Sequence, residues 1–186
     1  MSEQNPLKLI LRALGLWIKG RVHFRGGLDT IRLENHGETF AAFRKVDVDP
    51  SAEQPARPGA IFQVRFTFKN LSATANRRLS LIPIPLIVAQ PGFRSKTWFL
   101  GQQTGDFIGL YEFDTVEEAG AYWDSLPLRI MRRRAAEGSL GHQISSSEAP
   151  KKAEKIVTAR KEPAMKSHES SLRKVEQLER FGMPLN

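Results

Sequence analysis

The chain has 186 residues, which is enough for one filled hydrophobic core with extensions but too few for two. It contains no cysteine, and this excludes disulfides, thiolate catalysis and cysteine-ligated metal sites. The formal net charge of +8 comes mainly from separate basic clusters at residues 8–25, 129–134 and 151–180, without a nucleic-acid-binding motif, so we do not expect nucleic acid as a partner.

Residues 1–20 are typical of a basic amphipathic helix, because large apolar residues are interleaved with lysine and arginine. The apolar stripe of such a helix packs on its own domain or on a partner subunit, or it lies on a membrane surface through residues such as Leu11 and Trp17. No apolar run is long enough for a transmembrane helix. Together with the absence of cysteine, this predicts a soluble, cytoplasmic protein, with peripheral membrane contact as the one qualification.

Residues 21–58 predict a β-meander followed by a proline-rich linker. Short apolar runs alternate with turns, and Asn35-His36-Gly37 has the composition of a tight hairpin turn. The three prolines Pro50, Pro55 and Pro58 then interrupt any apolar periodicity, as is typical of a surface loop.

Residues 59–145 predict a strand, helix, strand, strand, helix, strand unit. The first strand alternates apolar and polar residues from Phe62 onward. Ser72 is placed to cap a helix that continues to Leu81. The proline-interrupted run 82–88 is expected to be mostly non-helical, and to line a pocket mouth or lie over the open face of the sheet.

The second half of this unit begins with a hairpin of strands at 93–100 and 107–113. Thr115 and Glu118 have the spacing of a capping box, which predicts the start of the second helix. Pro127 is expected to kink that helix or to split it, and a last short strand completes the unit.

The predicted fold class is α+β, with a ferredoxin-like βαββαβ antiparallel sheet and both helices on one face. An N-terminal helix and the β-meander precede it. Residues 146–186, rich in Ser, Lys, Glu and Ala, are predicted to be a mostly disordered basic tail. The second face of the sheet would be bare and apolar, so we expect two copies to pair face to face as a homodimer.

Three stretches of this unit carry a likeness to a known family. They are Phe62 to Phe68, the run from Leu81 through Gln90-Pro91-Gly92-Phe93 to Trp98, and Gly109-Leu110-Tyr111-Glu112 with the helix at 117–134. They resemble the dimeric α/β-barrel superfamily, and within it small monooxygenases of the antibiotic-biosynthesis type, over slightly less than half of the chain.

The resemblance implies a homodimer with a small-molecule pocket between the sheet and its helices. Some members of the superfamily oxidise aromatic substrates with oxygen and without a cofactor. Others degrade haem, isomerise small acids or have no known activity, so the resemblance implies the fold more firmly than the chemistry.

A pocket for such chemistry needs apolar walls and a few polar groups that take a proton from the substrate and hold its anion. The candidate ligand-binding residues are Trp98, Tyr111, Tyr122, Trp123 and Lys96, and the candidate catalytic residues are His142 and Arg94. Aromatic residues at these spacings more often fill a core, and a lone histidine is more often an ordinary surface or core residue. The basic cluster at 132–134 either binds an anion or is the solvated end of a helix.

The spacing of the four histidines predicts no metal site, and no cofactor is expected. Two functions follow from the sequence. The first is a small-molecule-binding dimeric protein that acts as a cofactor-independent monooxygenase on an apolar or aromatic substrate. The alternative is a non-catalytic interaction module whose N-terminus docks on a membrane or on a protein partner.

Overall fold

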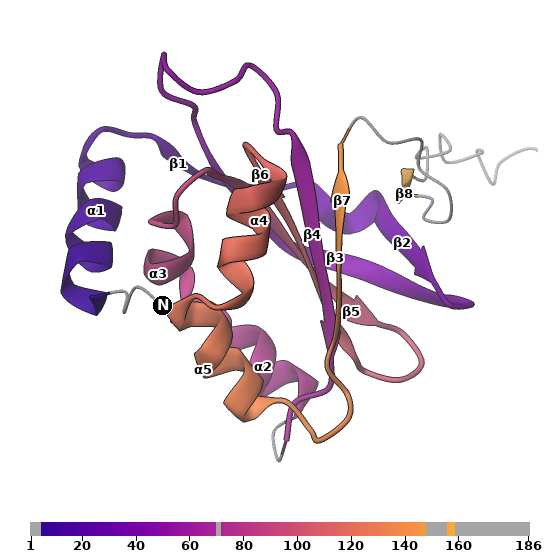
Figure 1. Ribbon diagram of the computed structural model, residues 1–186. Helices are drawn as coiled ribbons and strands as arrows, with labels where there is room; N and C mark the ends of the chain where they lie inside the picture. The colour runs from indigo at the N-terminus through magenta and orange to yellow at the C-terminus, as the bar shows by residue number, and fades with distance from the viewer. Residues whose placement is uncertain (1–4, 70–71, 148–155, 159–186) are drawn as a thin grey trace, which may run out of the picture.

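The computed structural model describes residues 5–69, 72–147 and 156–158, which form one antiparallel sheet with helices on one side (Figure 1). The strands are β1 (Val22–Arg25), β2 (Ile31–Asn35), β3 (Glu38–Val48), β4 (Ala60–Phe66), β5 (Phe93–Gly101), β6 (Phe107–Phe113), β7 (Gly141–Ser146) and β8 (Ile156–Thr158). The helices are α1 (Pro6–Ile18), the 3-10 turn η1 (Leu28–Thr30), α2 (Ala73–Leu79), α3 (Ile84–Val88), α4 (Val116–Trp123) and α5 (Leu126–Arg134).

The strand order confirms the predicted fold class. The sheet runs β7-β4-β6-β5-β3-β2-β8, and β1 pairs with the far end of β3. Within it, β4, β5, β6 and β7 with the intervening helices form the βαββαβ unit, in the spatial order of a ferredoxin-like sheet. The predicted β-meander continues this sheet, because β3 pairs antiparallel with the edge strand β5.

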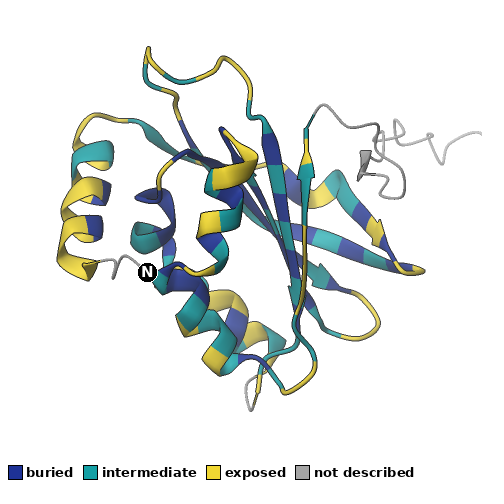
Figure 2. Cartoon of the chain, in the orientation of Figure 1, coloured by how far each residue is buried: buried dark blue, intermediate teal, exposed yellow. Residues whose placement is uncertain are grey.

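The helix-covered face of the sheet carries the main hydrophobic core. Along β4, Phe62, Val64 and Phe66 are buried and alternate with half-buried residues, which appears as dark blue and teal bands in Figure 2. Ring contacts join Phe62 to Tyr111 of β6 and to Tyr122 of α4, each at 5.5 Å between centroids. Each fully buried apolar side chain of this kind contributes roughly 1.5–3 kcal/mol.

Both predicted helix starts are confirmed. Ser72 is the N-cap of α2, where its hydroxyl accepts a hydrogen bond from the Ala75 amide at 3.2 Å. Thr115 caps α4 in the same way by accepting from the Glu118 amide at 3.2 Å. Each side chain satisfies a backbone donor that has no partner within its helix.

One prediction drawn from the prolines is wrong. The run 82–88 was expected to be mostly non-helical, but residues 84–88 form α3. Pro83 is the N-cap of this helix and Pro85 lies in its first turn, where a backbone amide has no intrahelical partner to lose. Pro127 likewise lies in the first turn of α5, so the predicted second helix is split into α4 and α5.

Gly92 opens β5 in a conformation that requires glycine. Its φ is +61°, and a Cβ at this position would overlap the carboxylate of Glu118. Its carbonyl also accepts a hydrogen bond from the Asp114 amide at 2.9 Å, so the turn cannot easily shift. The Pro-Gly-Phe strand entry is therefore a steric requirement of the fold.

We expect Gly92→Ala to lower the free energy of unfolding by about 1 kcal/mol, because alanine is strained at this positive φ, while the flexible Glu118 side chain can move aside. Chemical denaturation measures this. The matched control is Gly120→Ala in α4, where a Cβ meets nothing within 4 Å and no positive φ occurs. That substitution should stabilise slightly. Equal stability of the two variants would contradict the assignment.

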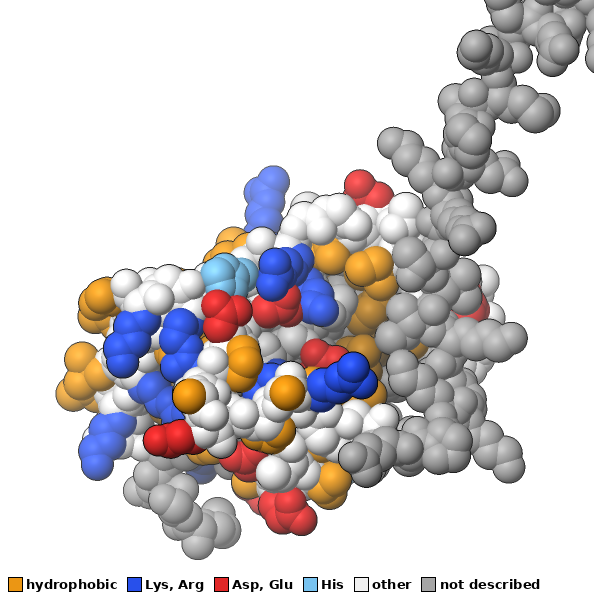
Figure 3. All heavy atoms as spheres, turned by 90° about the horizontal axis from the view of Figure 1, so that it is seen from above, with side chains coloured by type: hydrophobic (Ala, Val, Ile, Leu, Met, Phe, Trp, Pro, Cys, Tyr) orange, Lys and Arg blue, Asp and Glu red, His pale blue; other side chains and the backbone are white. Residues whose placement is uncertain are grey.

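Helix α1 lies at the outer edge of the helical layer, beside α3, and contacts the protein on one side. Its residues Leu9 and Ala13 are buried, and α1 packs against α3. In Figure 2 its outer side is yellow, and in Figure 3 orange and blue side chains gather on the side of the molecule where Figure 1 places α1. The helix predicted at residues 1–20 is thus present, and one of its faces packs on the protein itself.

The second face of the sheet is partly covered within one chain. A separate apolar cluster forms there from η1, β2, β3, β5 and β6. Its members are Leu28, Leu33, Phe40, Ala42, Phe99 and Ile108. Among the residues the structure describes, none of the strongly exposed apolar side chains lies on the strands β4 to β7. Part of the surface assigned to a second copy is therefore already in contact with the same chain, and the homodimer stays a prediction.

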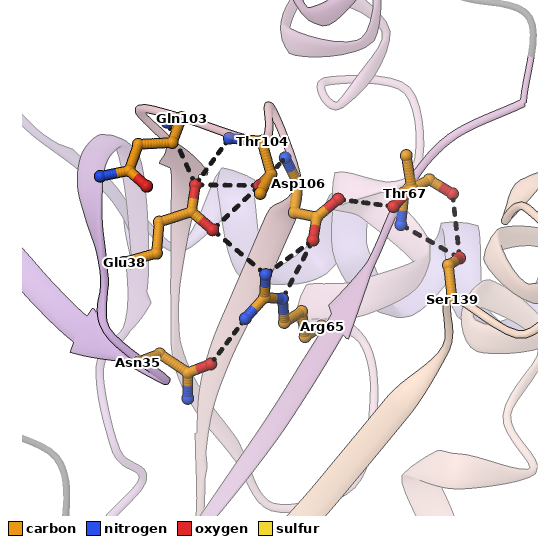
Figure 4. A network of polar contacts seen from close by, with 8 residues as sticks. All are labelled: Asn35, Glu38, Arg65, Thr67, Gln103, Thr104, Asp106 and Ser139. Carbon is orange, nitrogen blue, oxygen red and sulfur yellow. Dashed lines mark hydrogen bonds and ion pairs between the residues drawn. The ribbon is translucent and has the colours of Figure 1, made fainter.

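A polar network ties the N-terminal hairpin to the ferredoxin-like unit (Figure 4). Arg65 of β4 lies at its centre and contacts Asp106 at 2.8 Å, Glu38 at 3.1 Å and Asn35 at 3.1 Å. The Glu38 carboxylate also accepts hydrogen bonds from the Thr104 amide and hydroxyl, each at 2.9 Å. Burial would raise the pKa of Glu38, but these bonds and the Arg65 charge outweigh burial and lower it.

Most of the predicted disordered tail, residues 146–186, lies outside the described residues. The short segment 156–158 forms β8, which pairs antiparallel with β2. None of the helices that the structure describes is long and apolar enough to cross a membrane.

Candidate active site

An apolar cavity of about 130 Å³ lies between the sheet and the helices α2, α3 and α5. The sheet contributes Phe66, Lys96, Trp98, Phe107 and Tyr111. The helices and the linker between α2 and α3 contribute Leu79, Ile82, Leu86, Ile87, Ile130 and Met131. A cavity of about 150 Å³ holds a benzene ring, and drug-sized ligands need roughly 300–1,000 Å³. The space therefore suits a molecule of about one aromatic ring.

Two lining residues mark the entrance to this cavity. Ile82, in the linker before α3, is 70% exposed, and Ile130 of α5 is 41% exposed. Both also line the cavity, so it opens to solvent between the linker and α5. The proline-interrupted run does line a pocket mouth, as predicted from its sequence.

Lys96 is the polar group at the sheet side of the cavity. The alternation along β5 places Lys96 and Trp98 on the helix-covered face, opposite Tyr111 and Gly109 of β6. The Lys96 ammonium position lies 4.2 Å from the centre of the Trp98 ring and 4.4 Å from that of Tyr111. Lys96 takes part in none of the ion pairs found among the described residues.

Burial lowers the pKa of Lys96 well below its ordinary value, and the nearby positive charge of Arg44 lowers it further. An amine in this environment is neutral over part of the pH range in which an exposed lysine is charged. A neutral amine accepts protons and is nucleophilic. Lys96 can therefore act as a base on a molecule bound above it.

Two buried phenols stand beside this amine. Tyr111 is 1% exposed and Tyr122 is 2% exposed, and their ring centres are 4.8 Å apart. Both line the cavity. Burial raises the pKa of Tyr111 and of Tyr122, so both hydroxyls keep their protons near neutral pH. Their hydroxyls share a hydrogen bond, so the pair has one O–H left to donate to a ligand, and neither phenol can serve as a base.

The remaining polar groups at the cavity make it electropositive. Arg134 and Asn76 line it, and the Arg134 guanidinium donates to the Asn76 side-chain oxygen at 3.3 Å. Arg44 of β3 lies close by and donates to the carbonyl of Arg77 and to the hydroxyl of Ser80. None of the lining residues that the structure describes is acidic. A ligand with negative charge, or one that becomes negative, is favoured here.

Four of the seven residues singled out from the sequence meet at this cavity: Lys96, Trp98, Tyr111 and Tyr122. Asn76 and Arg134 also line the cavity but were not among the site residues predicted from the sequence. For Arg134 there was a signal, because the basic cluster at the end of the second helix was one candidate for binding an anion. For Asn76 there was none, because a polar residue in a short helix has no distinctive pattern.

Arg94 lies outside the cavity and holds the chain together. It is 8% exposed and forms an ion pair with Asp114 at 2.9 Å. It also donates to the carbonyl of Pro55 at 3.0 Å, in the proline-rich linker. Its charge is paired and its donors point away from the candidate site, so this geometry favours a structural role.

Trp123 and His142 stack on one another at the outer edge of the sheet. Their ring centres are 3.7 Å apart with an angle of 16° between the rings. Arg132 lies over the other side of Trp123, with its guanidinium carbon 4.6 Å from the ring centre. Neither Trp123 nor His142 is among the residues that line the cavity. The site residues predicted from the sequence thus divide into four at the cavity, the Trp123–His142 stack beside Phe62, and Arg94 in its ion pair.

The described residues bring no three potential metal ligands together. Comparison with known proteins adds little. No protein-family model matches the sequence, and no curated protein sequence matches it.

Two solved structures are similar in part. One is a heme-degrading enzyme from Listeria monocytogenes, with 13% identity and a TM-score of 0.42, covering 67% of this chain and 95% of that one. The other is a candidate monooxygenase from Fusobacterium nucleatum subsp. nucleatum, with 8% identity and a TM-score of 0.40. It covers 59% of this chain, and the chain spans about half, 49%, of its length. The ferredoxin-like assignment rests on the strand order of the chain itself.

Proposed function

We propose that the protein binds a small, mostly apolar molecule of about one aromatic ring that carries an acidic group, and that Lys96 takes the proton of this group. The observation that carries the proposal is a buried amine that has aromatic neighbours, faces a cavity and lacks a carboxylate partner among the described residues. A buried charge without a partner is unfavourable, so a ligand that becomes an anion at this point supplies the missing partner.

The reaction that this arrangement supports is a cofactor-independent oxidation. Lys96 removes a proton from an acidic CH₂ group next to a carbonyl, and the ammonium that forms pairs with the resulting anion. The hydrogen-bonded pair Tyr111–Tyr122 donates one hydrogen bond to its oxygen. Dioxygen then takes electrons from the anion. The CH₂ group becomes a carbonyl, one oxygen atom enters the product, and the other leaves as water with both hydrogens.

Binding and proton transfer are tested with 4-nitrophenol, a single-ring acid whose anion is yellow. The wild type should bind it and shift it toward the anion. Lys96→Met should bind it roughly ten- to hundredfold more weakly and without the colour change, because a charge-assisted contact is lost. Lys45→Met is the matched control, since Lys45 pairs with Thr97 on the opposite face of the sheet from Lys96 and contacts Asp47 at 3.6 Å. Equal binding by wild type and Lys96→Met would overturn the proposal.

Oxidation is tested with 2-indanone, whose CH₂ groups are acidic, under isotopically labelled dioxygen. The expected product is 1,2-indandione with one labelled oxygen atom, and Lys96→Met should form none above the background. If the protein binds 2-indanone but forms no labelled product, it is a binding protein and the proposed oxidation is wrong.

A further inference from the structure

Helix α1 presents three different faces when its residues are placed at about 100° each around the axis. Leu9 and Ala13 share the face that packs on the protein. Lys8, Arg12 and Lys19 form a basic strip beside it. The rest of the circumference is apolar and points to solvent. It comprises Leu7, Ile10, Leu11, Leu14, Trp17 and Ile18, which are 36–77% exposed.

This apolar stripe is larger than the face that packs. Six large side chains in one row on a short helix exceed the scattered exposed apolar residues of an ordinary surface. They follow a helical period, so they form one contiguous stripe along α1. The fold does not need these residues for its core, because α1 is already held by its opposite face. The stripe is therefore a surface that fits a partner.

The charges around the stripe indicate what kind of partner. Residues 5–28 include Lys8, Arg12, Lys19, Arg21 and Arg25 but no Asp or Glu. Lys8, Arg12 and Lys19 take part in none of the ion pairs of the described ranges. In Figure 3, blue side chains lie next to orange ones on the side where Figure 1 places α1. An apolar stripe beside unpaired positive charge complements a surface that is apolar inside and negative outside.

A second copy of the chain fits this surface less well. Pairing two α1 helices along their stripes would bring two basic strips toward each other with no acidic residue of residues 5–28 to offset them. An anionic bilayer meets both requirements. Its acyl region accepts the leucines and isoleucines, its interface accepts Trp17, and its phosphates pair with the strip.

We propose that α1 docks the protein on the surface of a membrane that contains anionic lipid, with the helix axis parallel to the bilayer. The helix lies in the interface and does not span it, since 13 residues are too short. Because α1 packs against α3 and α3 lines the cavity, docking would place the candidate site close to the bilayer, where apolar molecules concentrate.

Sedimentation of the full chain with lipid vesicles tests the proposal. It should bind vesicles of equal parts phosphatidylcholine and phosphatidylglycerol, and bind pure phosphatidylcholine far less. Leu11→Glu and Leu14→Glu should each weaken binding more than tenfold. Changing Lys8, Arg12 and Lys19 together to Gln should weaken it roughly hundredfold, at about fivefold for each charge. Added salt should weaken wild-type binding for the same reason.

The matched control is Val116→Glu, which places a charge at an apolar residue of α4 that is 44% exposed. It should bind vesicles like the wild type. All variants should unfold at the wild-type temperature and bind 4-nitrophenol unchanged, which separates this proposal from that for the cavity. Equal sedimentation of Leu14→Glu and Val116→Glu would overturn it. The proposal would also be overturned if the wild type did not bind anionic vesicles but self-associated, and if Leu14→Glu disrupted this self-association.

Discussion

Arg65→Met is expected to lower the free energy of unfolding by about 3 kcal/mol, at the lower end of the range for breaking a buried ion pair. The Arg65 side chain is 26% exposed, but those of its partners Glu38 and Asp106 are only 6% and 17% exposed. Removal leaves two carboxylates facing each other without the cation between them. The guanidinium also covers the ring of Phe40, with 5.0 Å from its carbon to the ring centre, so packing is lost as well.

Chemical denaturation at several pH values measures this. Burial alone would raise the pKa values of Glu38 and Asp106 in the native state. Hydrogen bonds and the Arg65 charge outweigh burial and lower both pKa values. The stability from a lowered carboxylate pKa is complete above the ordinary value of about 4 and is lost as pH falls below it. The wild type should therefore lose more stability on acidification than Arg65→Met does.

The control is Arg25→Met, which removes an arginine that is 55% exposed and leaves its partner Asp47 in contact with Lys45. Such pairs contribute about 0–1 kcal/mol, so little change is expected. If Arg65→Met were no less stable than Arg25→Met, the network of Figure 4 would not hold the N-terminal hairpin to the ferredoxin-like unit.

The order of elements could be predicted because each rests on a local pattern. Alternation in β4 requires no knowledge of the rest of the chain, and the caps at Ser72 and Thr115 act within four residues. The proline run failed for an equally local reason. Two prolines exclude the middle of a helix but fit its first turn, and the sequence did not reveal where that turn began.

Arg94 shows why part of the site could not be predicted. Arg94 was a site candidate as a polar residue near Lys96 and Trp98, and in a regular strand all three would point to the same face. The register of β5 against β6 shifts between Phe93 and Ser95, so Arg94 is an extra residue in a bulge. It is directed to Asp114 instead of the cavity. A bulge depends on pairing between strands and leaves no clear mark in one sequence.

The sequence could not show which of Tyr122 and Trp123 would face the cavity. Neighbouring residues on a helix are about 100° apart, and although the rings of Tyr122 and Trp123 both contact Phe62, only Tyr122 also lines the cavity. The cavity itself could not be predicted from the sequence. Whether aromatic residues fill an interior or line a space depends on where α2 and α3 come to lie over β5, which local patterns do not determine.

Lys96→Met should make the protein more stable, and the gain should grow as pH falls. Burial lowers the native pKa of Lys96, while in the unfolded chain it returns to about 10.4. Below that value the unfolded chain binds a proton that the native state lacks, so Lys96 destabilises the wild type. Each pH unit adds about 1.4 kcal/mol until the pH reaches the native pKa, below which the penalty is constant. Methionine fills a similar volume without this penalty.

Urea denaturation of both proteins from pH 9.5 down to pH 7 measures the difference. The two free energies of unfolding should diverge on acidification until the pH reaches the native pKa of Lys96. Lys45→Met, which alters a lysine that is 31% exposed and paired with Asp47, should follow the wild type in parallel. A difference independent of pH would mean that native Lys96 keeps its charge. A destabilised Lys96→Met would mean that its amine is part of the packing. Either result would remove the neutral base on which the proposed proton transfer depends, because that base exists only if burial favours the uncharged amine.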